Sequence, residues 1–286
     1  MSEPPLKNAL LASLDTVRRL DHDRLLTALL APANQRAKLI ALYAFNAEIT
    51  RVREVVSEPM LGQIRLQWWR ETIEPLGGGH GRGHEVAESL LAAFGRENID
   101  ISGLISLIDA RERDLDDEPF EKLSDLIAYC EGTSSALMVC AAKTLSFDEA
   151  EMASEVLKSA GIGFALTGLL RALPMHASQG RLYLPLELMR KHDVDPHQIF
   201  AGQMSDALRT IILEIACEAK KYLNESRNGQ SHPARAILPA LWPASLSDLY
   251  LKKMTAPTFN PFVNTTQLPV FQLQLRLLGR KITGRF

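Results

Sequence analysis

The stretch ALYAFNAEITRVREVV, residues 41–56, decides the fold of this chain. Its apolar side chains recur at intervals of three and four, at Leu42, Phe45, Ile49, Val52 and Val56. That spacing predicts one helix over residues 36–56 that buries a single apolar stripe. Ser57-Glu58-Pro59 follows, and proline disfavours helical geometry in the residue before it, so we expect the helix to end there.

The same period continues through the rest of the chain, which predicts an all-α protein. We expect further helices over residues 61–73, 84–96, 101–114, 122–143, 147–173, 185–192 and 205–226. The glycine-rich run at residues 77–83 indicates a loop. The prolines between Pro233 and Pro269 predict short helices and turns. We expect one domain over residues 1–286, with residues 233–286 as a proline-punctuated C-terminal extension packed on it.

Composition excludes several classes of protein. The formal net charge of −2 on 286 residues gives no footprint for nucleic acid. Cys130, Cys140 and Cys217 form no Cys-x-x-Cys pair, which argues against a zinc knuckle or a disulfide framework and favours a reducing compartment. The N-terminus has no secretory or mitochondrial targeting pattern, and no apolar run approaches the ~18 residues of a membrane span. We therefore expect a cytoplasmic protein.

A second informative stretch is LTGLLRALPMH, residues 166–176, followed by GRLYLP at residues 180–185. Together with residues 41–56, LQWWRE at 66–71, Asp114-Leu115 and Tyr129-Cys130, it resembles the squalene/phytoene synthase family. The resemblance implies the all-α isoprenoid-synthase fold, with helices around a central apolar cavity. It also implies two Asp-x-x-x-Asp motifs, whose carboxylates hold the Mg²⁺ that neutralises a prenyl diphosphate.

This chain departs from the family pattern at both motifs. The first pair of positions holds Thr50 and Glu54, which a continuous helix would place on one face with Tyr43 and Ala47, opposite the buried stripe. Arg51 stands where the family usually has a further aspartate, and a fixed cation there opposes Mg²⁺ binding. The other interpretation of Thr50, Arg51 and Glu54 is a solvated or ion-paired surface.

The second pair of positions holds Ala172 and His176. Alanine offers no ligand, and imidazole suits zinc better than magnesium. Pro174 lies between them, so we expect the helix to end or kink there, which puts the spacing of the pair in doubt. A surface or helix-end histidine is the alternative for His176. With one carboxylate where the family has four, we expect no metal, no catalytic residue and no cofactor; Mg²⁺ would be needed only by an active synthase.

Arginines remain near both motifs and can bind phosphate oxygens without a metal. A ligand such as a lipid phosphate or an isoprenoid would use a candidate set of Tyr43, Arg51, Glu54, Arg171, Arg181 and Tyr183. The alternative is that these arginines pair with neighbouring acids such as Glu54.

The segment from Val52 to Arg70 resembles more closely the synthase-like assembly factors of respiratory complex I and their bacterial relatives. That likeness implies a non-catalytic role in assembly, with complex I subunits or an isoprenoid or lipid as partner. Two other hypotheses stay open: an active head-to-head prenyl transferase, and a metal-independent carrier of an isoprenoid or lipid.

The tail from Leu268 to Phe286 is apolar and basic and contains no acid. Such a helix can lie on an anionic membrane, which would make the protein peripheral at the inner face of the inner membrane. The alternative is a final helix docked on the domain with its charges in water.

Overall fold

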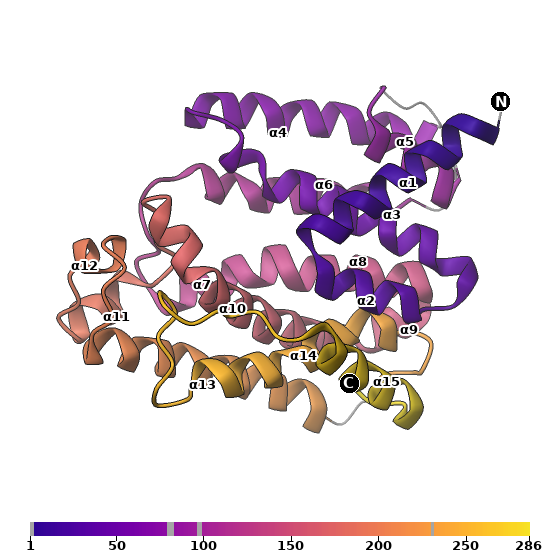
Figure 1. Cartoon of the computed structure of the whole chain (residues 1–286). Helices are drawn as coiled ribbons and strands as arrows, with labels where there is room; N and C mark the ends of the chain where they lie inside the picture. Colours follow the sequence, from indigo (N-terminus) through magenta and orange to yellow (C-terminus); the bar gives the residue numbers. More distant parts are fainter. Residues whose placement is uncertain (1–2, 79–82, 96–98, 230–231) are drawn as a thin grey trace. The chain divides into compact units, whose positions relative to one another are not determined.

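The computed structural model describes residues 3–78, 83–95, 99–229 and 232–286. These residues form helices and connecting segments with no strand, which confirms the predicted all-α class (Figure 1). Residues 79–82 of the predicted glycine-rich loop lie outside the described part of the chain.

The chain divides into two compact units, each assembled from segments that are far apart in the sequence. Unit 1 comprises Met1–Asp116, Ala136–Met152 and Ala234–Ala240. Unit 2 comprises Asp117–Ser135, Ala153–Pro233 and Leu241–Phe286. The single domain expected from the sequence stays a prediction.

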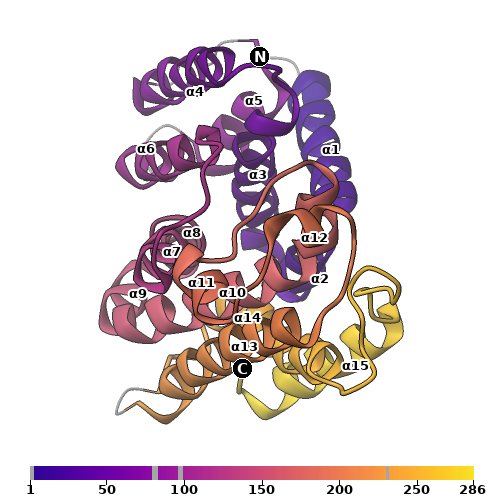
Figure 2. The same ribbon diagram turned by 90° about the vertical axis from the view of Figure 1, so that its left-hand side faces the viewer.

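Unit 1 is built around one helix that is buried on almost every side. Its helices are α1 (Glu3–Leu20), α2 (His22–Leu30), α3 (Ala33–Thr50), α4 (Pro59–Ile73), α5 (Glu85–Phe94), α6 (Ile101–Ala110), α8 (Ala136–Leu145) and α9 (Phe147–Met152), with the 3₁₀ turns η1 (Val52–Glu54), η2 (Glu74–Gly78) and η3 (Arg111–Leu115). Helices α1, α5 and α8 pack around α3 (Figure 2). The core of the unit includes Trp69, which packs edge-on against Phe45.

Several helices of unit 1 begin where a side chain accepts a hydrogen bond from a free backbone N–H. Asp21 caps α2 through Arg24 N, and Asp100 caps α6 through Gly103 N. His84 caps α5 through Val86 N, with its ring against Trp68 and Trp69. Each cap satisfies one of the donors that the first turn of a helix leaves unpaired.

Unit 2 is organised along two long packed helices, α10 (Ser154–Ser178) and α13 (Asp206–Asn228). Its other helices are α7 (Leu123–Cys130), α11 (Leu186–Lys191), α12 (Pro196–Phe200), α14 (Leu238–Met254, from Leu241 on) and α15 (Val270–Thr283), with the π turn η4 (Glu131–Ser135). Close approach along α10 depends on two glycines: Gly161 lies against Ser135 of η4, and Gly163 lies against Leu223 of α13.

Two prolines that the sequence suggested as helix ends lie inside helices. Pro174 sits within α10, which continues to Ser178, and Pro243 sits within α14. Of the two expectations for Pro174, an end or a kink, the end of the helix was therefore wrong. A proline removes one backbone hydrogen bond, but Leu170 and Leu173 before Pro174 and Ala177 after it are buried, and their packing holds the helix.

Helix α10 is also long and apolar enough to cross a membrane, although 56% of its most apolar 18-residue stretch is buried inside the protein. Core helices of soluble proteins commonly have these properties. A helix was predicted over most of this range, but not one apolar enough to span a membrane, because Lys158 and Arg171 interrupt the apolar run.

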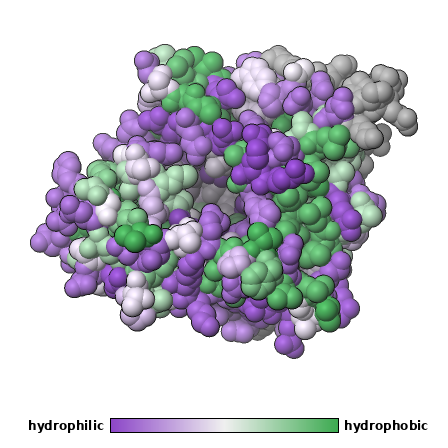
Figure 3. All heavy atoms as spheres, viewed as in Figure 1, coloured by the Kyte–Doolittle hydropathy of each residue, from purple (hydrophilic) through white to green (hydrophobic). Residues whose placement is uncertain are grey.

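Helix α15 packs on unit 2 through two leucines and an arginine, and leaves its other apolar side chains exposed. Leu273 and Leu277 are buried, and Arg276 on the same side pairs with Asp248 of α14. The opposite side carries the apolar residues Phe271, Leu275, Leu278 and Ile282, between 48% and 73% exposed. Green apolar residues accordingly appear at the lower right of Figure 3, where α15 lies in the same view. The docked helix was one of the two expectations, but its arginines do not all lie in water.

Candidate functional site

The first motif stretch does not form the continuous helix that its spacing predicted. Helix α3 ends at Thr50, Arg51 forms a turn, and Val52–Glu54 is the 3₁₀ turn η1. The hydroxyl of Thr50 donates a hydrogen bond to the carbonyl of Asn46 at 2.7 Å, inside its own helix. Thr50 and Glu54 therefore do not face a ligand as an i,i+4 pair on one helix.

The face predicted to lie opposite the buried stripe is itself buried. Tyr43 and Ala47 are 1% and 5% exposed, so α3 is buried on this second face as well as along the predicted stripe. The cause is that α3 lies among neighbouring helices on several sides. A stripe pattern identifies the first buried face of such a helix and overlooks the second, because alanine and tyrosine are compatible with either environment.

Tyr43 is almost completely buried within unit 1. The guanidinium carbon of Arg24 is 5.8 Å from the centre of its ring, and Arg24 pairs with Asp21 at 2.6 Å. Burial raises the pKa of the Tyr43 phenol far above its ordinary value, while the nearby Arg24 partly opposes that change. The phenol therefore stays protonated at physiological pH.

Arg51 and Glu54 pair with each other. The Arg51 Nε to Glu54 Oε2 distance is 3.7 Å, and both side chains are about one-third exposed, at 37% and 35%. This is the ion-paired alternative expected from the sequence. The single carboxylate that remains at the first motif already has a cation beside it, which disfavours a divalent ion there.

The second motif stretch keeps its helical spacing, contrary to the doubt raised by Pro174. Ala172 and His176 both lie in α10, one turn apart. The His176 ring packs on the Tyr183 ring with centroids 4.5 Å apart. His176 is thus a partly buried aromatic neighbour of Tyr183, and neither motif position of α10 presents a carboxylate.

The contact between His176 and Tyr183 follows from how α10 ends. Gly180 adopts a left-handed backbone with φ +68°. Its N–H bonds to the carbonyl of Ala177 at 3.0 Å, and the N–H of Arg181 bonds to the carbonyl of His176 at 2.9 Å. These two bonds form a Schellman motif, which favours glycine at that position. The reversal carries Arg181–Pro185 back along the helix, and this is the structural role of Gly180 in GRLYLP.

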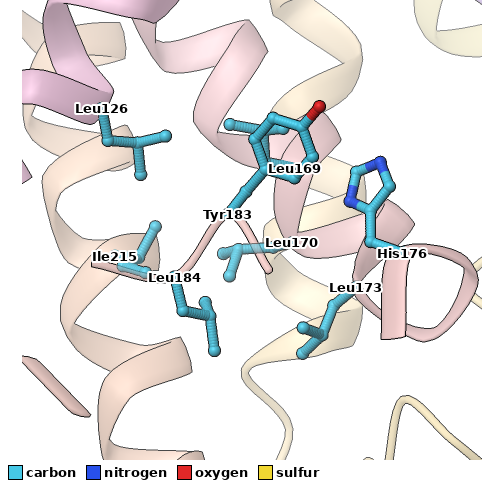
Figure 4. A pocket seen from close by; sticks show the side chains of 8 residues that line it. All are labelled: Leu126, Leu169, Leu170, Leu173, His176, Tyr183, Leu184 and Ile215. Carbon is cyan, nitrogen blue, oxygen red and sulfur yellow. The ribbon is translucent and has the colours of Figure 1, made fainter. Parts of the chain in front are cut away.

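Tyr183 completes an aromatic cluster that nearly fills the space beside α10. Its ring lies 5.9 Å from that of Tyr129 and 6.1 Å from that of Phe120, and the guanidinium of Arg181 lies 5.5 Å from its centre. The small apolar cavity beneath is lined by Leu126, Leu169, Leu170, Leu173, His176, Tyr183, Leu184 and Ile215 (Figure 4). It leaves about 10 Å³ for the centre of a water-sized sphere, the space of about one water molecule.

Arg171 lies in a second, open depression of unit 2. Its guanidinium carbon is 3.6 Å from the centre of the Tyr250 ring, a close cation–π contact. The depression offers about 470 Å³ and is lined by Gly168, Arg171, Ala172, Pro174, Met175, Pro261, Asn264, Thr265, Thr266 and Gln267. The 261–267 loop and Tyr250 could not be assigned to this site from the sequence, since no periodic signal links them to α10.

The donors present do not fit a magnesium cluster. Thr50 bonds to its own helix, Glu54 pairs with Arg51, Ala172 has no donor and His176 packs on an aromatic ring. Within the described residues, no group of three or more His, Cys, Asp and Glu side chains is placed to hold a metal ion. Magnesium prefers several oxygen ligands, which these four positions do not supply.

Two groups of known proteins are similar to most of this chain. The rat protein "NADH dehydrogenase (ubiquinone) complex I, assembly factor 6" is 31% identical over 265 residues, covering 91% of this chain and 78% of the rat protein. The human protein of that name is 32% identical over 255 residues, covering 87% of this chain and 74% of the human one. A chloroplastic phytoene synthase from Daucus carota is 24% identical over 250 residues, covering 84% and 61%.

Solved structures show the same fold. A dehydrosqualene synthase superposes with a TM-score of 0.81 at 17% identity, covering 97% of both chains. The squalene synthase HpnC from Alicyclobacillus acidocaldarius superposes with a TM-score of 0.69 at 16% identity, covering 88% of this chain and 96% of that one. The expected isoprenoid-synthase fold is thereby confirmed. The sequence profile "Squalene/phytoene synthase" matches residues 17–277, and the chain therefore belongs to the squalene/phytoene synthase family.

Proposed function

We propose that this protein is a non-catalytic member of the family that assists assembly of respiratory complex I. The observation that carries the proposal is the set of side chains at the four positions of the two motifs. Thr50, Ala172 and His176 replace carboxylates, and the remaining Glu54 is paired with Arg51. Diphosphate cannot leave a prenyl diphosphate as an anion without positive charges to neutralise it, and metal ions held by carboxylates usually supply those charges.

The relatives supply the biological role in this proposal. The rat and human proteins that match most of the chain carry the name of a complex I assembly factor, at 31% and 32% identity. The phytoene synthase match is weaker, at 24% identity. Loss of the catalytic donors together with similarity to assembly factors favours a role in binding over a role in chemistry.

We propose that the protein is cytoplasmic and peripheral at the inner face of the inner membrane. The exposed apolar side of α15 supports this location, because four adjacent apolar side chains on one helix face gain free energy on leaving water. An interfacial helix of this kind buries its apolar face at the boundary between headgroups and acyl chains.

A lipid or isoprenoid ligand is the finer part of the proposal. The open depression beside Ala172 has room for about 470 Å³ and is lined in part by Arg171. Such a site can hold a phosphate or a polar isoprenoid headgroup without a metal. Native mass spectrometry of gently purified protein should detect a bound lipid or isoprenoid, and a ligand-free mass would contradict this part.

The assembly role is tested by deleting the gene and measuring NADH:quinone oxidoreductase activity and complex I abundance in membranes. We expect both to fall, and to be restored by the wild-type gene and by a Glu54→Gln variant alike. Restoration by Glu54→Gln is informative because a metal-dependent synthase would lose its remaining motif carboxylate. Unchanged complex I in the deletion strain would refute the assembly role.

The absence of catalysis is tested separately. Purified protein is incubated with farnesyl or geranylgeranyl diphosphate and Mg²⁺, beside an active dehydrosqualene synthase as control. We expect no squalene, phytoene or diphosphate release above the protein-free rate. Formation of a head-to-head product would make the protein an active prenyl transferase.

A further inference from the structure

A cluster of arginines surrounds one carboxylate where α13, α14 and α15 meet in unit 2. Asp248 of α14 accepts a hydrogen bond from Arg227 Nη1 at 2.9 Å and another from Arg276 Nη2 at 2.5 Å. Arg280 Nη2 lies 4.0 Å from the same carboxylate. Arg276 also donates through Nε to the carbonyl of Ser245 at 3.2 Å.

The charges in this cluster do not balance. Three guanidinium groups share one aspartate, and Arg285 adds a fourth positive charge near Arg280. Burial lowers the pKa of Arg280 from its ordinary value, and repulsion from Arg276 and Arg227 lowers it further. Like charges held together away from water destabilise a fold unless an anion compensates them.

The hydrogen bonds in the cluster are also incomplete. Nε and Nη2 of Arg227 and Nε of Arg280 are buried and have no hydrogen-bond partner. A buried donor without a partner is costly, and most buried donors in native proteins are satisfied. The three side chains nevertheless keep 20–30% of their surface exposed, so a ligand can approach them from solvent.

We propose that Arg227, Arg276 and Arg280 form a binding site for a phosphate-type oxyanion. A tetrahedral oxyanion has several acceptor oxygens, and small rotations of the guanidinium groups would let it bond to the unpaired N–H groups of Arg227 and Arg280. Guanidinium groups bind phosphate with two parallel hydrogen bonds, which gives both charge compensation and direction. None of these residues belongs to the two motif stretches or lines the depression beside Ala172, so the site stands independently of the proposed assembly role.

Arg280→Gln is the most informative variant. Of the three arginines that pair with Asp248, Arg280 is the farthest from it, so its loss leaves both short ion pairs of Asp248 in place and we expect the fold to stay intact. Arg190→Gln is a matched control in the same unit, because Arg190 makes an exposed pair with Glu121 at 2.5 Å. Circular dichroism verifies that each variant is folded before binding is measured.

Thermal unfolding in inorganic phosphate is compared with unfolding in chloride at equal ionic strength. At a phosphate concentration about ten times the dissociation constant, we expect Tm of the wild type and of Arg190→Gln to rise by about 3 °C. For Arg280→Gln we expect phosphate affinity to fall by about tenfold, measured by titration calorimetry. A wild-type Tm equal in phosphate and chloride, or equal phosphate affinity of Arg280→Gln and wild type, would overturn the proposal.

A second arm distinguishes the source of the oxyanion. Vesicles of phosphatidylcholine with and without phosphatidic acid are sedimented with each protein. Binding to phosphatidic acid that inorganic phosphate displaces and that Arg280→Gln weakens would support the site with a lipid headgroup as its ligand. A phosphate-dependent Tm with no such vesicle binding would support the site with a soluble phosphate compound as its ligand.

Discussion

Replacing Gly161 by alanine should destabilise the protein through a single steric contact. A Cβ built on Gly161 would overlap Cα and Oγ of Ser135 and would lie 2.7 Å from the Ser135 backbone nitrogen. Backbone atoms cannot rotate out of the way. Ser135 is also fixed by its hydroxyl, which donates to the carbonyl of Lys158 at 2.7 Å. The π turn that ends at Ser135 and helix α10 would therefore have to separate.

The magnitude follows from two opposing terms. Overpacking in a filled core costs about 1–3 kcal/mol, and contact with the backbone favours the upper end of that range. Alanine gains about 1 kcal/mol over glycine in a helix interior. The expected net loss for Gly161→Ala is about 2 kcal/mol in the free energy of unfolding. With an m-value of about 3 kcal/mol/M, the urea midpoint falls by about 0.7 M.

Gly168 supplies the control within the same helix. A Cβ there would meet no atom within 4 Å, so Gly168→Ala has only the gain in helix propensity and should stabilise by up to about 1 kcal/mol. Both variants are unfolded in urea and followed by circular dichroism at 222 nm. A Gly161→Ala protein as stable as the wild type, or equal losses at both positions, would refute the reasoning.

Three further results are expected. Burial lowers the pKa of the His84 cap, so its contribution to stability is complete above pH ~6.5 and is lost as pH falls. His84→Asn keeps a capping side chain, so it should reduce the dependence of the free energy of unfolding on pH, measured by urea titration from pH 7 to 5. Leu277→Ala, at a fully buried position of α15, should lower the free energy of unfolding by about 2–5 kcal/mol. Leu275→Ala, at a position 64% exposed, should change it by less than about 0.5 kcal/mol, and similar losses for the two variants in thermal unfolding would contradict the docking of α15. Burial raises the pKa of the Cys140 thiol to about 12, so Ellman's reagent at pH 8 should label exposed Cys217 in the native protein and Cys140 only after denaturation.

Most helices could be predicted because their signals are local. The helix predicted over residues 205–226 is α13 at Asp206–Asn228, with Ser205 as its N-cap. The 17-residue helix α14 was missed because Pro243 indicates a break, whereas burial of Leu241 and Leu246 outweighs the lost hydrogen bond. Propensity describes a segment in isolation, and tertiary packing decides its final conformation.

At the candidate site too, contacts between residues close in the sequence could be predicted, and contacts between distant residues could not. The turn at Gly180 that returns Tyr183 to His176 spans a few residues, and glycine after a helix is a readable signal. The contact of Arg171 with Tyr250 joins residues 79 positions apart, and one sequence gives no indication of such a pair. The chemistry missing at Ala172 could be read directly, because alanine has no ligand atom in any environment.

The interleaving of the two units has a consequence for how the chain is made. Unit 1 begins at the N-terminus but also needs residues 136–152 and 234–240. A ribosome adding ~5–20 residues per second needs roughly 6–25 s to travel from residue 117 to residue 240. During that interval the nascent N-terminal helices lack their last partners and keep apolar side chains open to water. We therefore expect the emerging polypeptide to need chaperones that shield it, and a chain truncated after residue 116 not to fold on its own.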